Sequence, residues 1–259
     1  MTDSDVQILI CSCDNYSDVW DPFFTLFFRY WPDCPYKINL IANHKTCLNP
    51  RVATIATDPN SDWSSAFLHA LSTICSKYVI VVMEDYLLTT PVSTETIRSM
   101  GAFMDGNGVS CLYLHPIETK GPTVARIAGF EVCEVRPGTA YRINLQAAVW
   151  QKSYLESIVR KGENAWSFEV CGSRRSTEAR GDIFSVNCAP DRSPLPYYCT
   201  GVVRGVWMPG AVRLCKKEGV AIDFSKRRVG WIRGMFRDYR ILRPVRLVFV
   251  FVKRLLGLH

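Results

Sequence analysis

The sequence predicts an α/β fold, with a mainly parallel central sheet flanked by helices and a basic amphipathic tail at the C-terminus. The continuous apolar run of residues 78–83 (YVIVVM) is typical of a strand buried on both faces of a parallel sheet. Strand-like and helix-like stretches alternate through the first half of the chain, which favours parallel strands joined by helices. Lys and Arg are concentrated after residue 225, which predicts a terminal segment of different character.

The first half of the chain divides into short apolar runs and helical patterns. Apolar runs between turn residues predict strands at 6–12, 37–42, 52–57 and 78–83. Aromatic residues at helical spacing predict a core-facing helix over 19–30. A turn rich in Asp, Asn and Ser precedes a second helix, which we expect to begin with Ser61 or Asp62 as its N-cap.

The second half has fewer regular patterns. A helix is predicted over 93–104, followed by a turn at 105–108 and a strand at 109–114. Residues 115–142 have few helix signals and are expected to form strands and loops. An apolar run at 146–150 is expected to lead into a helix at 153–160. The other expected elements are helices from about 164 and at 212–218, and strand-like chain over 182–209.

The composition is that of a globular protein with a substantial core. The chain has 259 residues, of which 48% are hydrophobic and 21% charged. Its eleven cysteines are scattered, odd in number and without a CxxC pair, so neither a disulfide framework nor a zinc site is predicted. The N-terminus lacks the basic and apolar regions of a signal peptide, so we expect a reducing, cytoplasmic location. His69 and His115 are isolated and are interpreted as structural.

The positive charge belongs to the C-terminal segment. Residues 226–259 contain ten Lys and Arg against one acid, whereas the preceding 225 residues contain 21 against 23. A groove for nucleic acid would place basic residues in the body of the fold, so nucleic-acid binding is not expected.

Residues 233–259 mix cations with large apolar side chains. The apolar run at 247–252 is too short to span a bilayer, which needs about 20 residues. We expect the segment to lie in the interface of an anionic membrane, with apolar side chains in the headgroup boundary and Arg and Lys on phosphates. A C-terminal helix packed on the domain, or an oligomer interface, is the structural alternative.

Two carboxylates, Glu84 and Asp85, follow the strand predicted at 78–83. In an open α/β sheet, ligands bind beyond the carboxyl ends of the strands, so acidic side chains at this position indicate a site. The alternative is an ordinary exit from strand to loop, where Asp is common.

Six stretches of the chain carry a resemblance to a known family: SCDNYSDVWDPFF (12–24), DWSSAFLHAL (62–71), YVIVVMEDYLLT (78–89), NLQAAVW (144–150), GENAWSFE (162–169) and VVRGVWMPGAVRLCKKEGVAIDFSKR (202–227). In this order they resemble the GT-A-type glycosyltransferases of bacterial lipopolysaccharide and capsular polysaccharide assembly. The resemblance implies a GT-A-like (Rossmann-like) sheet. It also implies transfer of a sugar from a nucleotide-sugar donor to a hydroxyl of a lipid-linked glycan.

The same resemblance implies how the chain is organised. Residues 1–228 would form the transferase domain, with a nucleotide-sugar half at about 1–115 and an acceptor half at about 116–228. Residues 229–259 would form the membrane-associating tail. The expected partners are a nucleotide sugar, a glycan or lipid-linked glycan acceptor, and an anionic membrane surface. The protein would be cytoplasmic and peripheral at the inner face of the cell membrane.

Glu84 and Asp85 lie where the resemblance places an Asp-x-Asp motif that contacts the donor diphosphate. Asp85 would bind the diphosphate directly or through Mn²⁺ or Mg²⁺. The run here is Glu-Asp-Tyr, and this departure weakens the expectation of a metal. Without a metal, cations of the chain would stabilise the leaving group, and the candidates are Arg204, Lys226, Arg227 and Arg228.

Glu169 is the expected general base, because the resemblance places a catalytic carboxylate in the first turn of a helix here. Trp166 and Phe168 would line the acceptor pocket, and the exclusion of water would raise the pKa of the carboxylate. A base that deprotonates the acceptor implies inversion at the anomeric carbon. The alternative is an acid that complements the helix dipole without a catalytic role. Glu163 and Asp85 are the reserve candidates.

Five further residues are candidates for contact with the donor or with sugars. Asp14 follows the first strand, where the resemblance places nucleoside contacts, and its alternative role is to cap the next helix. Trp63 and Ser64 begin a helix, whose N-terminus would suit the base or the phosphates. Asn144 and Gln146 would bind sugar hydroxyls or satisfy backbone groups.

Two other functions stay open at this point. A nucleotidyltransferase that makes the nucleotide sugar would normally carry a Gly-rich loop after the first strand, and CDNYSD has no glycine. A non-catalytic membrane adaptor would use the sheet only as a scaffold. The sequence does not identify the donor, the acceptor or the linkage.

Overall fold

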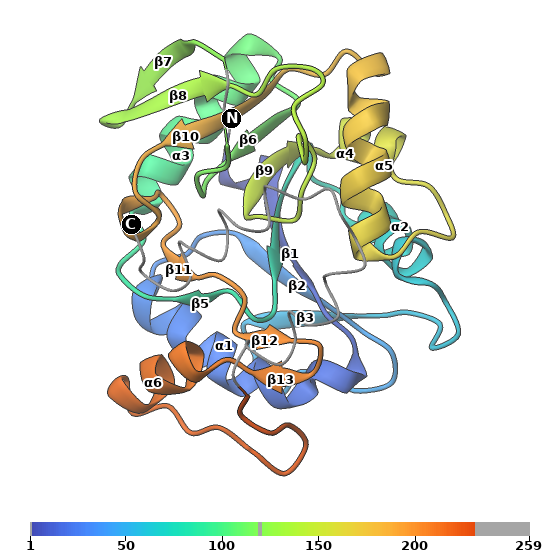
Figure 1. Cartoon of the computed structure of the whole chain (residues 1–259), viewed down its shortest axis with the longest axis vertical. Coiled ribbons are helices and arrows are strands. Elements are labelled where there is room, and N and C mark those ends of the chain that lie inside the picture. Colours follow the sequence, from blue (N-terminus) through green and yellow to red (C-terminus); the bar gives the residue numbers. More distant parts are fainter. Residues whose placement is uncertain (1, 119–120, 231–259) are drawn as a thin grey trace.

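The computed structural model of the chain describes residues 2–118 and 121–230, which are built around a nine-stranded sheet (Figure 1). Its strands are β1 (Val6–Cys11), β2 (Lys37–Ala42), β3 (Val52–Ala56), β4 (Tyr78–Met83), β6 (Cys111–Tyr113), β7 (Thr123–Ile127), β8 (Phe130–Glu134), β9 (Ala148–Gln151) and β10 (Ile183–Asn187). They lie in the order β3-β2-β1-β4-β9-β6-β10-β8-β7, and every strand except β8 and β9 runs in the same direction. The predicted mainly parallel sheet is therefore confirmed.

Helices cover both faces of the sheet, as predicted (Figure 1). They are α1 (Ser17–Tyr30), α2 (Trp63–Thr73), α3 (Thr94–Asn107), α4 (Lys152–Ile158), α5 (Ala165–Glu178) and α6 (Pro209–Lys217), with short 3-10 turns at Asp3–Asp5, Asp14–Tyr16 and Pro190–Arg192. Apolar residues of α1, α3 and α6 form one core, and those of α2, α4 and α5 form the other.

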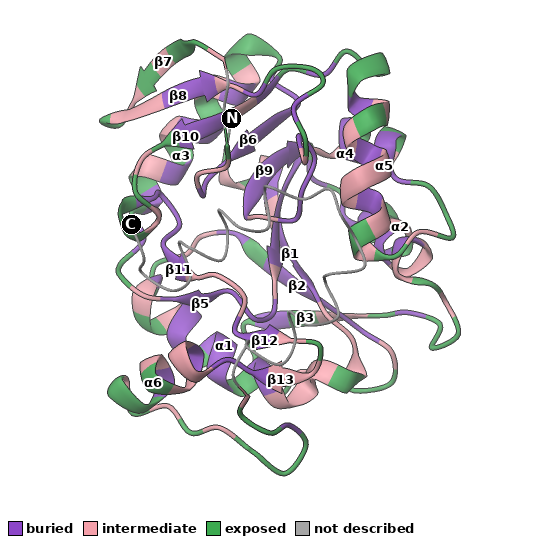
Figure 2. Cartoon of the chain, viewed as in Figure 1, coloured by how far each residue is buried: buried purple, intermediate pink, exposed green. Residues whose placement is uncertain are grey.

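The central strand β4 is buried on both sides. Ile80 and Val82 pack in the core with α1, α3 and α6, whereas Val79 and Val81 pack in the opposite core. All four residues are at most 2% exposed, and Figure 2 shows the buried strands between the more exposed helices. The apolar run from which the fold was predicted thus contributes alternate side chains to each core.

The ends of the strands determine where loops meet. β1 pairs in parallel with β4 from Val6 and Tyr78 to Cys11 and Met83, so the two strands end side by side. Beyond this edge, β5 (Leu87–Leu88) pairs with β11 (Tyr197–Tyr198), and β12 (Val202–Val203) pairs with β13 (Val206–Trp207). Residues far apart in the sequence are therefore brought to the carboxyl ends of β1 and β4.

The C-terminal boundary of α3 differs from the prediction. α3 continues through the turn predicted at 105–108 and ends at Gly108, which is left-handed with φ of 64°. Asp105 remains in the helix, where its carboxylate accepts a hydrogen bond of 2.6 Å from Lys77. The Asp and Gly residues that suggested a turn belong to the last helical turn and its C-cap.

Within the described residues, no helix combines the length and the apolar character needed to cross a bilayer. Residues 231–259, which include almost all of the predicted membrane-associating tail, lie outside the described residues. The membrane association of that tail therefore stays a prediction.

Candidate active site

Glu84 and Asp85 directly follow β4 and are both buried, at 4% and 7% exposed. The Glu84 backbone N–H donates to the carbonyl of Cys11 at the end of β1 (3.4 Å). The loop after β1 therefore borders the two acids. Both acids lie at the edge of the sheet where open α/β folds bind ligands.

The two carboxylates are only partly satisfied by the protein. Asp85 Oδ2 accepts the backbone N–H of Val202 (3.1 Å), whereas Glu84 Oε2 is buried without a hydrogen-bond partner. Burial raises the pKa of Asp85 to about 6, although backbone N–H groups oppose this effect. Burial and the charge of Asp85 raise the pKa of Glu84 well above its ordinary value. A cation placed here would stabilise the charged form of both acids.

A hollow of about 580 Å³ opens beside the end of β1 and contains several cations. It is lined by Asp14, Asn15, Tyr16, Lys45, Lys226 and Arg227. The ammonium groups of Lys45 and Lys226 both donate to the Ser17 hydroxyl, at 2.7 and 3.1 Å. This proximity of like charges lowers the pKa of Lys45, and an anion bound between the two ammonium groups would relieve their repulsion.

Arg227 connects the hollow to the acids after β4. Its guanidinium donates to Asp18 (2.8 Å) and to the Asn15 carbonyl, and it lies 4.3 Å from the ring centroid of Tyr16. The positive charge of Arg227 opposes the rise in the pKa of Glu84. Burial is the main cause that raises the pKa of Tyr16, and the charge of Glu84 raises it further. The hollow and the two buried acids therefore form one electrostatic unit.

Asp14 holds the loop after β2, and it does not cap the next helix through its side chain. Its carboxylate accepts backbone N–H groups of Asn43, His44 and Lys45 at 2.8–3.3 Å. Burial alone would raise the pKa of Asp14. The three hydrogen bonds together have the larger effect and hold the pKa below its ordinary value. Asp14 thereby fixes the position of Lys45, which the sequence did not identify as a candidate.

Trp63 and Ser64 lie at the start of α2 and are not among the residues that line the hollow. The Ser64 hydroxyl accepts the backbone N–H of Glu163 (3.0 Å), and the indole of Trp63 packs against Phe168 of α5 with ring centroids 5.6 Å apart. The N-cap of this helix is Asp62, one of the two residues predicted for that role. In the structure, both donor candidates connect α2 to neighbouring elements.

Glu169 is the fifth residue of α5, beyond the first turn that was predicted for it. Its Oε1 accepts the backbone N–H of Leu145 (2.8 Å), and no hydrogen bond to Oε2 is found within the described part of the chain. Burial raises the pKa of Glu169 to about 7, against the effect of the Leu145 hydrogen bond. The helix dipole acts mainly on the first turn, so it does not account for an acid at this position.

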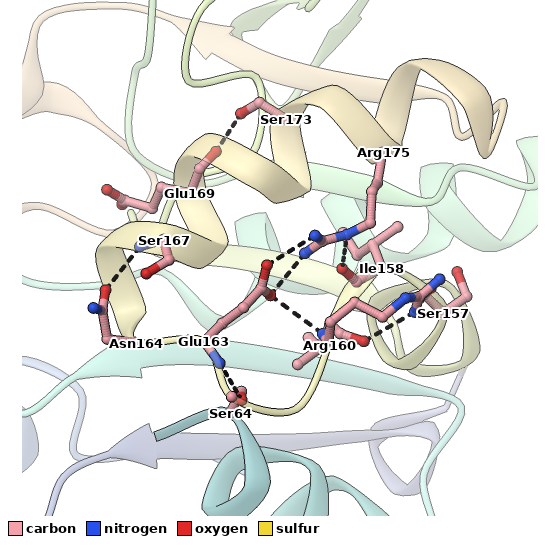
Figure 3. Close-up of polar contacts among 12 residues, drawn as sticks. Ser64, Ser157, Ile158, Arg160, Glu163, Asn164, Ser167, Glu169, Ser173 and Arg175 are labelled. Carbon is pink, nitrogen blue, oxygen red and sulfur yellow. Dashed lines mark hydrogen bonds and ion pairs between the residues drawn. The ribbon is translucent and has the colours of Figure 1, made fainter. Parts of the chain in front are cut away.

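The reserve candidate Glu163 is fully engaged (Figure 3). Its two carboxylate oxygens accept hydrogen bonds from the guanidinium of Arg175 at 2.8 and 2.7 Å, and Oε2 also accepts the Arg160 backbone N–H (3.2 Å). Figure 3 shows the Glu169 carboxylate pointing away from this ion pair. The arrangement of Glu163 is that of a structural anchor for the start of α5.

Gln146 lies in a buried polar cluster between the two acidic regions. Its Oε1 accepts the Tyr197 hydroxyl (2.7 Å), its Nε2 donates to the Tyr86 hydroxyl (3.4 Å), and the two tyrosine rings stack with centroids 4.5 Å apart. Burial is the main cause that raises the pKa of Tyr86, and the charges of Asp85 and Glu169 add to it. The charges of both acids therefore act on the same tyrosine. The sequence identified Gln146 but neither tyrosine as a site residue.

The other predicted sugar-binding residues have different surroundings. Asn144 uses its side chain within its own loop, accepting the Gln146 N–H (2.9 Å) and donating to the Tyr141 carbonyl (3.0 Å). Phe168 is wholly buried in the core, whereas Trp166 is 53% exposed.

Arg204 lies in the exposed turn between β12 and β13, in a left-handed conformation with φ of 49°. It is not among the residues that line the hollow. Of the cations predicted for the leaving group, the structure places Lys226 and Arg227 there.

A divalent cation would find a partial set of ligands at this site. No group of three or more His, Cys, Asp or Glu side chains suited to a metal ion occurs among residues 2–118 and 121–230. The carboxylates of Glu84 and Asp85, with the unpartnered Glu84 Oε2, suit a hard cation that takes its other ligands from phosphate and water.

Several solved structures are distantly similar to this chain. S. aureus TarS 1–349 matches 70% of this chain and 57% of its own chain, with 12% identity and a TM-score of 0.47. The same protein in complex with UDP-GlcNAc gives 12% identity and a TM-score of 0.45, covering 70% of this chain and 54% of that chain. The bifunctional IspDF from Campylobacter jejuni gives 10% identity and a TM-score of 0.41, covering 74% and 52%.

This chain spans little more than half the length of these structures. No protein-family model and no curated protein matches it.

Proposed function

We propose that the protein is a glycosyltransferase that moves a sugar from a nucleotide-sugar donor to a hydroxyl of a glycan acceptor. The observation that carries the proposal is the cationic hollow at the end of β1, next to the buried acids Glu84 and Asp85. Lys45 and Lys226 converge on one hydroxyl there, and neither forms a salt bridge within the described part of the chain, which favours an anionic ligand such as a diphosphate.

The donor would lie along the carboxyl ends of β1 and β4. Lys45, Lys226 and Arg227 would bind the diphosphate, because charge-assisted hydrogen bonds from cations stabilise phosphate oxygens. When the bond between the anomeric carbon and the phosphate oxygen breaks, its electron pair stays on the diphosphate. These cations would stabilise that developing charge.

Mn²⁺ or Mg²⁺ bound by Asp85 and Glu84 would supply further charge stabilisation to the leaving diphosphate. Asp85 would contact the donor diphosphate, directly or through the metal, and would not accept the proton of the acceptor.

Glu169 would act as the general base. Its free Oε2 would accept the proton of the acceptor hydroxyl while the hydroxyl oxygen forms the new bond to the anomeric carbon. A pKa of about 7 leaves a substantial fraction of the carboxylate ionised at neutral pH while keeping it basic. Attack on the face opposite the leaving group would invert the anomeric configuration.

The acceptor is proposed to be a lipid-linked glycan of lipopolysaccharide or capsular polysaccharide assembly. The cations and apolar residues of 233–259 would hold the enzyme at the inner face of the cell membrane. Removing residues 233–259 should release the protein from anionic vesicles, and unchanged sedimentation with vesicles would contradict this part of the proposal.

A donor screen tests the proposal directly. The full-length protein is incubated with UDP-, GDP-, CMP- and TDP-sugars, with and without Mn²⁺ or Mg²⁺, and its thermal unfolding and donor hydrolysis are measured. At a ligand concentration 100 times Kd, one nucleotide class should add about 2.7 kcal/mol of stability. For a domain of this size, that corresponds to a rise in Tm of about 5–10 °C.

The screen also separates the alternatives. A nucleotidyltransferase would consume a nucleoside triphosphate and a sugar phosphate, so those substrates are included as a separate arm. No response to any nucleotide would contradict the proposal and favour a non-catalytic adaptor. If EDTA abolishes the nucleotide response, Glu84 and Asp85 would be assigned to metal binding. If EDTA has no effect on the response, Lys45, Lys226 and Arg227 would be the groups that stabilise the diphosphate.

A further inference from the structure

The geometry points to a binding platform for the ring of a pyranose sugar, built by Trp166 and Tyr141 beside Glu169. This inference rests on the proposed function, because it assigns the acceptor class for the same site. Among the tryptophans that the structure describes, Trp166 alone is mainly exposed, at 53%. An indole in contact with water at the start of a helix has no stabilising role in the core, so a ligand surface gives it a use.

The indole of Trp166 is held in one orientation. Its Nε1–H donates to the hydroxyl of Tyr141 (3.3 Å), so the polar edge of the ring is already satisfied. The hydroxyl of Tyr141 acts as acceptor in this bond and keeps its own hydrogen for a ligand. A fixed aromatic ring with a donor at its edge suits the face and rim of a sugar.

The backbone at Tyr141 is strained. Tyr141 has φ of 54°, in the left-handed region that bulky side chains rarely adopt. Its carbonyl accepts the Asn144 side-chain amide (3.0 Å), and this bond helps to hold the conformation. Such strain is typical of functional sites, where the surrounding structure maintains it.

The platform is joined to the proposed base by the same loop. Leu145, next to Asn144, donates its backbone N–H to Glu169 Oε1 (2.8 Å). Trp166 and Glu169 are three residues apart on α5, so their side chains share one face of the helix, with Cβ atoms about 5–6 Å apart. A sugar ring on Trp166 would therefore place one of its hydroxyls near the free Glu169 Oε2.

The chemistry favours a pyranose over other acceptors. One face of a pyranose presents polarised C–H groups that pack on an aromatic ring, while its hydroxyls need donors and acceptors at the rim. Tyr141 and Glu169 supply these polar groups. A lipid alcohol or the hydroxyl of a flexible peptide offers no flat C–H face for the indole, so the acceptor atom is assigned to a sugar hydroxyl.

Saturation-transfer NMR on the full-length protein tests the platform. The probes are the methyl pyranosides of glucose, galactose, mannose and N-acetylglucosamine at millimolar concentration. We expect transfer to the C–H protons of one ring face for at least one probe, and about tenfold weaker binding in Trp166→Ala. Trp166→Phe should recover part of the affinity. Phe224→Ala, which removes another exposed aromatic side chain, should have no effect.

The result distinguishes this inference from the proposed function. Absence of transfer for all four pyranosides, or equal binding by wild type and Trp166→Ala, would overturn the platform. The nucleotide response of Trp166→Ala is measured in parallel and should equal that of the wild type. A failed platform with an intact nucleotide response removes only the acceptor assignment, whereas sugar binding without any nucleotide response removes the transferase proposal and leaves a sugar-binding site.

Discussion

The end of β4 carries buried carboxylates and the second turn of α5 a partly buried one, all with raised pKa values, but their surroundings differ. At the end of β4, the positive charge of Arg227 opposes the rise in the pKa of Glu84. At Glu169, burial alone raises the pKa, and the only opposing effect is one backbone hydrogen bond. The first region suits the stabilisation of a charged ligand, and the second suits proton transfer.

Glu163 provides a third arrangement within the same segment as Glu169. Its carboxylate is paired with Arg175 through two hydrogen bonds and is therefore committed to structure (Figure 3). Residue type alone therefore does not define the role of these glutamates, because they differ in how many carboxylate oxygens are left without a protein partner.

The largest effect is expected at the base. Glu169→Gln keeps the shape of the side chain but cannot accept the proton, so turnover should fall by about 10²–10⁴-fold. Nucleotide affinity, measured by titration of the donor, should stay within a factor of two or so of the wild type because the hollow is unchanged. Normal turnover in Glu169→Gln would exclude this residue as the base. The difference proposed between the end of β4 and α5, charge stabilisation against proton transfer, would then be wrong.

The elements around these regions could largely be predicted from the sequence. The strands 37–42 and 78–83 agree with β2 and β4 at both ends, because continuous apolar runs are bounded there by turn residues and charges. The helix predicted from about 164 begins at Ala165, where the Asn164 side chain accepts the Ser167 N–H as an N-cap (2.8 Å).

The polar clusters could not be predicted in the same way. Tyr86 and Tyr197 meet only because the two-residue strands β5 and β11 pair across a long stretch of chain. Lys45 enters the hollow because Asp14 binds the backbone of its loop, and no local pattern marks that contact. Both depend on tertiary contacts, whereas periodicity and capping are local.

The second prediction concerns the paired carboxylate. Glu163→Gln leaves the Arg175 guanidinium without its charged partner at a site where the side chains are only 12% and 21% exposed. The free energy of unfolding, measured in urea, should fall by about 2–3 kcal/mol. Turnover per folded molecule should change little, because both oxygens of Glu163 are engaged by Arg175 and the proposed base is Glu169.

The matched control for this change is an exposed ion pair. Asp3→Asn breaks the pair with Arg98, whose side chains are 37% and 46% exposed, and should cost less than about 1 kcal/mol. If Glu163→Gln lost as much turnover as Glu169→Gln, Glu163 would have a role in the reaction and not only a structural one.

The pH dependence should distinguish the base from the acids at β4. A general base works in its deprotonated form, so with a pKa of about 7 the rate should rise about tenfold between pH 6 and pH 8 and then level off. Stability should move in the opposite direction. Because burial raises the folded-state pKa of Glu169, its contribution to stability is full at low pH and is lost as pH rises through about 7.

Urea unfolding of wild type and Glu169→Gln across this range isolates the contribution of Glu169, since Glu84 and Asp85 are present in both proteins. The difference in stability between them should change most between about pH 5 and pH 7. A difference that is constant with pH would mean that Glu169 does not titrate in the folded protein as expected.

The smallest effect is expected at the edge of the cationic hollow. Lys226→Ala removes one of two ammonium groups that share the Ser17 hydroxyl, so donor affinity should fall by about three- to tenfold at low salt. Lys216→Ala removes an exposed charge from α6, outside the hollow, and should leave affinity unchanged. The effect of Lys226→Ala should shrink as ionic strength rises, because this ammonium is exposed to solvent. Equal effects of the two substitutions would mean that the donor responds to overall charge, and the hollow would then lose its specific role beside Glu84 and Asp85.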